Sequence, residues 1–106
     1  MTDCVFCKIV KKEIPAAVEK ETGDFLIFKD VNPRAPVHLL IIPKKHYRDA
    51  LELPDNLWKG LRDVARELAK EKNLDGFRLV TNTGEAVAVN HMHMHFLGEV
   101  GKTREI

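Results

Sequence analysis

Short apolar runs alternate with turn-forming residues along most of the chain, a pattern typical of strands joined by tight turns. Between the first two runs, Thr22-Gly23-Asp24 has the composition of a hairpin turn. The third run is almost wholly apolar, as in a strand covered on both faces, and His38 is its one polar side chain before Pro43 closes it. The pattern predicts five strands, at residues 17–21, 25–28, 37–42, 77–80 and 89–97.

A longer segment has the three- and four-residue apolar spacing of an amphipathic helix. Pro54 and Asp55 open it, and it runs to about Lys72 with charged residues on the opposite face. We expect its apolar stripe, Trp58 included, to pack in the core.

A shorter helix is predicted near the N-terminus, with Asp3 as its cap, an end at Lys11 or Lys12, and the Ile14-Pro15 step beyond. Its expected inner residues are Val5, Ile9 and Val10. Hairpins with helices between them indicate an antiparallel α+β fold, with about five strands, one long helix and one short helix. The length favours a single domain over residues 1–106.

Composition narrows the class of partner. With 17 basic and 16 acidic residues and a net charge of +1, the chain lacks the electrostatic footprint of a protein that binds nucleic acid or an anionic membrane. No apolar run approaches the roughly 20 residues of a membrane span, and residues 1–4 do not resemble a signal peptide. We therefore expect a cytoplasmic protein.

Three histidines stand at alternate positions, His91, His93 and His95. In a strand they share one face, while Met92, Met94 and Phe96 take the other. Histidines on a solvated strand face can lack a function, and imidazole is also a common zinc ligand. Same-face neighbours lie about 6.6 to 6.8 Å apart, so two of these histidines can share a metal but three cannot.

Both cysteines fall in Cys4-Val5-Phe6-Cys7. A disulfide here would close a very small loop, which argues against a structural staple. A thioredoxin-type redox pair would need a preceding strand, and none is expected. A metal clip or a free thiol pair remains open.

Taken together, the motifs resemble the histidine triad (HIT) family, close to its Hint branch of nucleoside phosphoramidate hydrolases and their bacterial relatives. The resemblance covers nearly the whole chain. Its motifs are Cys4-Val5-Phe6-Cys7, Glu13-Ile14-Pro15, Phe28-Lys29-Asp30-Val31-Asn32-Pro33, His38 to His46 with Pro-Lys-Lys-His, and His91 to Gly98.

The resemblance implies catalysis by the histidines. His93 would attack the α-phosphorus of a nucleotide conjugate and form a nucleotidyl-histidine, and a neutral imidazole is a competent nucleophile near pH 7. The backbone carbonyl of His91 would fix the tautomer of His93. His95 would donate to a phosphate oxygen or protonate the leaving amine, and His38 would belong to the same site from the neighbouring strand.

It also implies the remaining sites. The nucleotide would meet His93, His95 and an earlier loop, where Asp30 accepts from the ribose, Phe28 and Val31 flank the base, and Asn82 reaches a phosphate oxygen. A structural zinc ion would be held by Cys4, Cys7, His46 and His91, in a closed Cys₂His₂ shell. No organic cofactor is expected. Relatives also imply a homodimer, with Trp58 and residues 77–80 in its interface.

The segment before the triad departs from the family pattern. It is about two residues short, with Val87 where glutamine is usual, Ala88 where the Hint branch carries a phosphate-contacting serine, and Asn90 at an aromatic position. The C-terminal residues 99–106 lack the usual tryptophan. Losing one charge-assisted hydrogen bond could lower binding or turnover about ten- to a hundredfold.

Three functions from different classes follow. The favoured one is hydrolysis of nucleoside phosphoramidates such as adenosine 5'-monophosphoramidate, with dinucleoside polyphosphates as the enzymatic alternative. The second is a nucleotide-binding regulatory module with little catalysis. The third is a zinc protein whose imidazoles are structural or carry hydrolytic metal chemistry. A turnover assay with and without chelator separates them.

Overall fold

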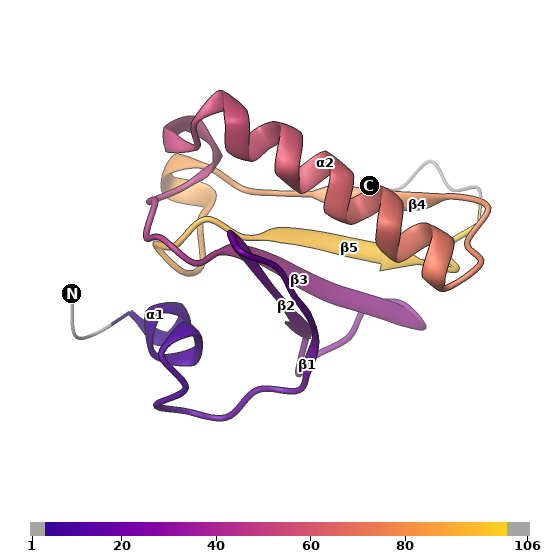
Figure 1. The fold of residues 1–106 in the computed structure, drawn as a ribbon, viewed down its shortest axis with the longest axis horizontal. Coiled ribbons are helices and arrows are strands. Elements are labelled where there is room, and N and C mark those ends of the chain that lie inside the picture. Colours follow the sequence, from indigo (N-terminus) through magenta and orange to yellow (C-terminus); the bar gives the residue numbers. More distant parts are fainter. Residues whose placement is uncertain (1–3, 102–106) are drawn as a thin grey trace.

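The protein is described by a computed structural model covering residues 4–101. Five strands form one antiparallel sheet in the order β1-β2-β3-β5-β4, flanked by two helices (Figure 1). The predicted α+β class is confirmed. In chain order the helices and strands are α1 (Val5–Val10), β1 (Val18–Glu21), β2 (Phe25–Lys29), β3 (Val37–Pro43), α2 (Asp55–Glu71), β4 (Phe77–Val80) and β5 (Met94–Gly98), with short 3₁₀ turns at Ala50–Glu52 and Gly84–Ala86.

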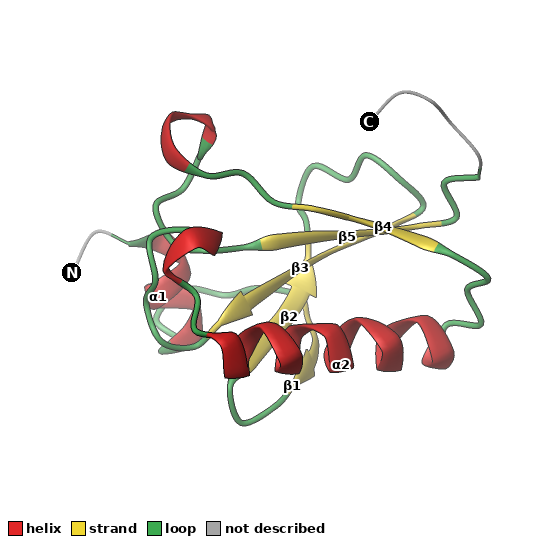
Figure 2. Cartoon of the chain, turned by 90° about the horizontal axis from the view of Figure 1, so that it is seen from above, coloured by secondary structure: helices red, strands yellow, loops and turns green. Residues whose placement is uncertain are grey.

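The two faces of the sheet carry separate apolar cores, which explains why β2 and β3 have apolar side chains on both faces. On one face α2 packs against alternate residues such as Ile27, Ile41 and Phe96. On the other face Phe6 of α1 packs with Phe28 and its neighbours. Figure 2 shows α2 running along one side of the sheet and α1 lying near the end of β3 and the beginning of β5.

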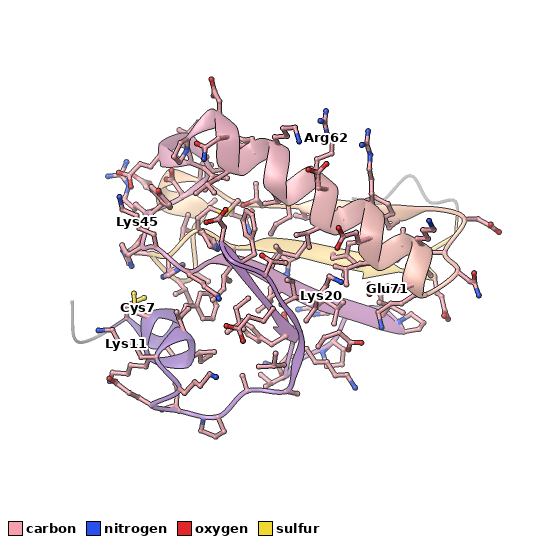
Figure 3. The ribbon with its side chains drawn as sticks, viewed as in Figure 1. Cys7, Lys11, Lys20, Lys45, Arg62 and Glu71 are labelled. Atoms are coloured by element: carbon pink, nitrogen blue, oxygen red, sulfur yellow. The ribbon has the colours of Figure 1, made fainter. Side chains whose placement is uncertain are left out.

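Helix α2 lies where the pattern predicts it, and its buried residues repeat at three- and four-residue spacing: Leu57, Leu61, Val64, Ala65 and Leu68. Trp58 is the exception, because it is 37% exposed rather than part of the core. It flanks the buried stripe instead of belonging to it. Near the other end of α2, Glu71 accepts a hydrogen bond from Lys20 of β1 at 2.7 Å (Figure 3).

Helix α1 differs from its prediction in three details. Its N-cap is Cys4, whose Sγ accepts from the Cys7 amide at 3.3 Å, whereas the predicted cap Asp3 lies outside the described residues. The helix ends at Val10, earlier than predicted. Phe6 is its buried residue and Val5 is 38% exposed, because the face that meets the sheet is centred on Phe6.

The histidine segment is shorter as a regular strand than its alternation suggests. β5 begins at Met94, so His91 and His93 precede it. Their segment is held by individual contacts, among them the Met92 amide donating to the carbonyl of Tyr47 at 2.7 Å. The alternation of faces survives, since Met92 and Met94 both belong to the core under α2. Within the described residues, no helix is long and apolar enough to cross a membrane.

Candidate functional site

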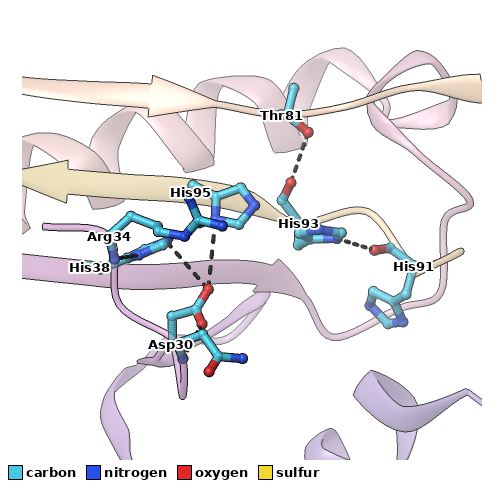
Figure 4. Close-up of polar contacts among 8 residues, drawn as sticks. Asp30, Arg34, His38, Thr81, His91, His93 and His95 are labelled. Carbon is cyan, nitrogen blue, oxygen red and sulfur yellow. Dashed lines mark hydrogen bonds and ion pairs between the residues drawn. The ribbon is translucent and has the colours of Figure 1, made fainter. Parts of the chain in front are cut away.

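The centre of the site is His93, one residue before β5. Its Nδ1 lies 2.9 Å from the carbonyl oxygen of His91 (Figure 4). A carbonyl only accepts, so Nδ1 carries the proton and Nε2 keeps a free lone pair in the neutral ring. The ring is only 7% exposed, and Phe6 packs edge-on against it with centroids 5.2 Å apart. This geometry presents one nitrogen as a nucleophile.

Beside His93 lies a group that we call the proton cluster: Asp30, His38 and His95. Nε2 of His38 is 2.9 Å from Nδ1 of His95, and both nitrogens face Oδ2 of Asp30 at 3.3 and 3.8 Å (Figure 4). Pairing of β3 with β5 brings these histidines together. The structure thus places His38 beside the last histidine of the triad.

A backbone amide determines which ring nitrogens of His38 and His95 carry the protons. The amide N–H of Arg34 donates to Nδ1 of His38 at 2.9 Å. Nδ1 must therefore accept, which places the proton of the neutral His38 on Nε2, directed at Nδ1 of His95. His95 in turn carries its proton on Nε2. Burial, followed by the neighbouring His93 and His38, lowers the pKa of His95 below the ordinary imidazole value.

The second group, which we call the thiol cluster, brings together Cys4, Cys7, His46 and His91, the four residues that the family resemblance implies. Nδ1 of His91 lies 3.3 and 3.5 Å from the two sulfurs, and Nδ1 of His46 lies 3.2 Å from Cys7 Sγ. All four ligand atoms are within 4.8 Å of one another. Burial, with the Cys4 thiol nearby, raises the pKa of the Cys7 thiol.

His91 has the opposite tautomer from His38. Its Nε2 lies 2.9 Å from the carbonyl oxygen of Pro43, so Nε2 donates and Nδ1 is left as a lone pair facing the sulfurs. A carbonyl that fixes the outer nitrogen is the usual support of a metal-binding histidine. Burial lowers the pKa of His91, which favours the neutral ring that a metal requires.

The four groups of the thiol cluster fit a zinc ion. Zn–S bonds of about 2.3 Å and Zn–N bonds of about 2.0 Å in a tetrahedron imply sulfur–nitrogen separations of about 3.5 Å. The sulfur–nitrogen distances from His91 to both cysteines and from His46 to Cys7 lie between 3.2 and 3.5 Å. The proton cluster also has metal-like spacing, but a metal on Nε2 of His38 would have to displace the proton that Arg34 fixes there. Only the thiol cluster is ready for a metal.

The predicted nucleotide-binding residues are more scattered. Phe28 is buried at 4% exposure, while Val31 is 90% exposed. Asn82 and Ala88 are exposed on the loop between β4 and β5. Among residues 4–101 no side-chain hydrogen bond ties Asn82 to the histidines. Asp30 lies at the histidines, and its other oxygen accepts from the Asn32 amide at 2.8 Å.

The sequence alone did not identify the groups that hold the histidine rings and the backbone around them in place. Three are backbone groups, the Arg34 amide and the carbonyls of Pro43 and Tyr47, and backbone groups leave no mark in a residue pattern. The fourth is the side chain of Thr81, whose hydroxyl donates to the carbonyl of His93 at 2.7 Å. Its only signal is a polar residue directly after a predicted strand.

Known proteins resemble this chain over nearly all of its length. An uncharacterized HIT-like protein of Methanocaldococcus jannaschii is 41% identical over 115 residues, covering 97% of this chain and 88% of that protein. The adenosine 5'-monophosphoramidase HNT1 of Saccharomyces cerevisiae is 38% identical, covering 89% of this chain and 61% of that protein. A 14 kDa zinc-binding protein of Zea mays is 42% identical, covering 89% and 80%.

The fold comparison agrees. The structure of a HIT family hydrolase from Clostridium thermocellum superposes with a TM-score of 0.87 at 39% identity, covering 100% of this chain and 98% of that one. A family model described as scavenger mRNA decapping enzyme C-term binding matches residues 3–105. With this coverage, and with the alternating histidines beside β3, the chain belongs to the histidine triad (HIT) family.

Proposed function

We propose that the protein hydrolyses the phosphorus–nitrogen bond of nucleoside phosphoramidates through a nucleotidyl intermediate on His93. The observation that carries the proposal is the hydrogen bond at one ring nitrogen of His93. Nδ1 of His93 is occupied by the His91 carbonyl, which leaves Nε2 as the nucleophile. The yeast relative that is a phosphoramidase supports this reaction class.

In the first step Nε2 of His93 attacks the α-phosphorus, and the bond from phosphorus to the leaving nitrogen breaks. The leaving nitrogen takes a proton from Nε2 of His95 in its imidazolium form and departs as an amine, which leaves His95 as the neutral ring. The Asp30 carboxylate, whose Oδ2 lies 3.8 Å from Nδ1 of His95, stabilises the positive charge of that ring before the transfer. In the second step water attacks phosphorus and returns a proton to His95, while His93 leaves and the nucleoside monophosphate is released.

Nucleotide binding is proposed for the surroundings of the proton cluster. Asp30 would accept from the ribose hydroxyls, while Val31 and Phe28 would meet the base. His95 and Asn82 would meet the phosphate. No charged side chain among residues 4–101 indicates which base is preferred. We propose a purine by similarity to the yeast enzyme.

The deciding experiment is a turnover assay on adenosine 5'-monophosphoramidate, with and without a chelator. We expect release of adenosine monophosphate, and we expect the chelator to leave the chemistry intact over short times because the proton cluster uses no metal. Turnover that stops immediately on chelation would instead support hydrolytic metal chemistry.

A nucleotide-binding module with little catalysis is the second candidate. The observation in its favour is the loop at Val87 and Ala88, which offers apolar side chains where polar phosphate contacts are usual in the family. Calorimetry with adenosine monophosphate separates the two functions. Binding at micromolar concentrations without turnover of any phosphoramidate or dinucleoside polyphosphate would establish the module and exclude the enzyme.

We also propose that the thiol cluster holds a structural zinc ion. Cys4, Cys7, His46 and His91 would form a closed shell that ties α1 to the histidine segment, with no open position for chemistry. The relative named as a zinc-binding protein supports the metal but names no ligands. Elemental analysis of protein purified without chelator should find about one zinc per chain.

Finally, we propose a homodimer built on β4 and the adjacent flank of α2. β4 is an edge strand of the sheet, and Phe77 and Leu79 on it are 37% and 38% exposed, as is Trp58 at 37% on α2. An edge strand with exposed apolar side chains is a surface that proteins normally cover. Sedimentation at micromolar concentration should give twice the 12.1 kDa chain mass, and the mass of one chain would refute the dimer.

A further inference from the structure

The backbone at His93 lies just outside the regular hydrogen bonding of the sheet, although the proposed chemistry requires this residue to be held rigidly. The ladder between β4 and β5 ends at the pair Val80–His95, and the ladder between β3 and β5 ends at Ile41–Met94. His93 is the next residue, so neither neighbouring strand holds it through a regular ladder. Its carbonyl would otherwise be free to rotate.

The side chain of Thr81 supplies a hydrogen bond to this segment beyond the end of the ladder between β4 and β5. Thr81 directly follows β4, and its hydroxyl donates to the carbonyl oxygen of His93 at 2.7 Å (Figure 4). Across the sheet from Thr81, the segment from His91 to His93 is anchored by the Met92 amide on the Tyr47 carbonyl and by the His91 ring on the Pro43 carbonyl. Both of these come from the side of β3. Thr81 is thus the anchor from the side of β4.

We propose that Thr81 is a positioning residue for the nucleophile, acting through the His93 carbonyl and not through the substrate. The inference rests on the proposed role of His93. Rotation of the peptide after His93 would change the reach of its ring toward the His91 carbonyl, which now accepts at 2.9 Å. Losing that contact frees the ring to exchange tautomers and to turn Nε2 away from phosphorus.

The test compares Thr81→Val with Thr81→Ser. Valine keeps the shape and removes the hydroxyl, whereas serine keeps the hydroxyl. We expect Thr81→Val to lower kcat about tenfold with KM within about twofold, because a small misplacement of a reacting group affects the chemical step. Thr81→Ser should restore at least half of the wild-type kcat.

Thr22→Val is the matched control, since Thr22 also uses its hydroxyl, to accept from the Phe25 amide at 3.0 Å in the hairpin turn. This variant should lose stability like Thr81→Val but keep the wild-type kcat. An equal loss of kcat in both valine variants would assign Thr81 a structural role only.

A second measurement does not depend on hydrolysis. Nitrogen NMR of the His93 ring should show one protonated and one unprotonated nitrogen in the wild type, and more nearly averaged shifts in Thr81→Val. If the wild type turned over no nucleotide conjugate, the proposed function would fail, while this measurement would still decide whether Thr81 orients the ring. Unchanged His93 shifts together with an unchanged kcat would overturn the proposal.

Discussion

Two histidine-containing clusters flank His93 and differ in the partner of one ring nitrogen. In the thiol cluster Nε2 of His91 donates to the Pro43 carbonyl, which leaves Nδ1 with a lone pair that faces the cysteines. In the proton cluster Nδ1 of His38 accepts from the Arg34 amide, which leaves the proton on Nε2, directed at His95. A carbonyl thus prepares one ring for a metal, and an amide prepares the other for proton transfer.

The comparison shows how hydrogen bonds prepare one residue type for the two kinds of chemistry that we propose, a few residues apart. The spacing of ligand atoms does not separate the clusters, because both are close enough for a metal. The hydrogen bond at the far nitrogen does separate them. His91 links the two regions, because its ring belongs to the thiol cluster and its carbonyl orients His93.

The largest effect is expected at the residue between the clusters. His93→Ala should abolish release of the nucleoside monophosphate, because it removes the proposed nucleophile, and should leave nucleotide affinity within about tenfold. The zinc content should not change, since His93 belongs to neither cluster. Turnover assays, calorimetry and elemental analysis check the three outcomes. Wild-type-like turnover by this variant would end the assignment.

Removing the thiol cluster should damage stability more than chemistry. Cys4→Ser with Cys7→Ser should lose the zinc and lower the melting temperature by about 10 °C, because metal binding contributes to folding. We expect kcat to fall by about tenfold, since the His91 carbonyl would orient His93 less firmly. If the untreated wild type contains no metal and chelators leave its melting temperature unchanged, the zinc site does not exist.

Removing the Arg34 amide should make the proton cluster resemble the thiol cluster in its affinity for a metal. Arg34→Pro deletes the N–H that holds Nδ1 of His38, so the proton can move to Nδ1 and free Nε2 for a metal. We expect about a tenfold loss of kcat and stronger inhibition by added zinc, measured as a lower inhibitory concentration. Arg34→Ala is the control, because it keeps the amide and removes an exposed side chain. Equal zinc sensitivity in both variants would break the comparison.

The smallest effect concerns pH and stability. Burial lowers the pKa of His95 below its ordinary value of about 6.5, so the unfolded chain binds the proton first as the pH falls. The contribution of the neutral His95 to the free energy of unfolding should therefore be complete above about pH 6.5 and decrease as the pH falls below it. Urea unfolding at pH 7.5 and 5.5 measures the decrease. His95→Asn should show a smaller decrease than the wild type, and an identical one would exclude this contribution.

Much of the fold could be read from the sequence, because apolar periodicity reports which face of each element is buried. The strands at residues 25–28 and 37–42 and the long helix were placed within a residue or two. Trp58 was assigned wrongly to the core, since a residue at the margin of an apolar stripe has the same spacing as one at its centre. The strand at residues 89–97 was drawn too long, because alternation continues in a segment that individual contacts hold.

The family resemblance implied all four members of the thiol cluster and placed His38 with His95, but it assigned Asp30 to the ribose and did not indicate the tautomers of the rings. The sequence by itself determined the residue types, the strand order along the chain and the alternation that puts three imidazoles on one face. The tertiary structure alone decided which ring nitrogen accepts and which donates in the two clusters, because the deciding groups are the Arg34 amide and the Pro43 carbonyl. Nearly every residue has backbone groups like these, so only folding can select the ones that meet a histidine.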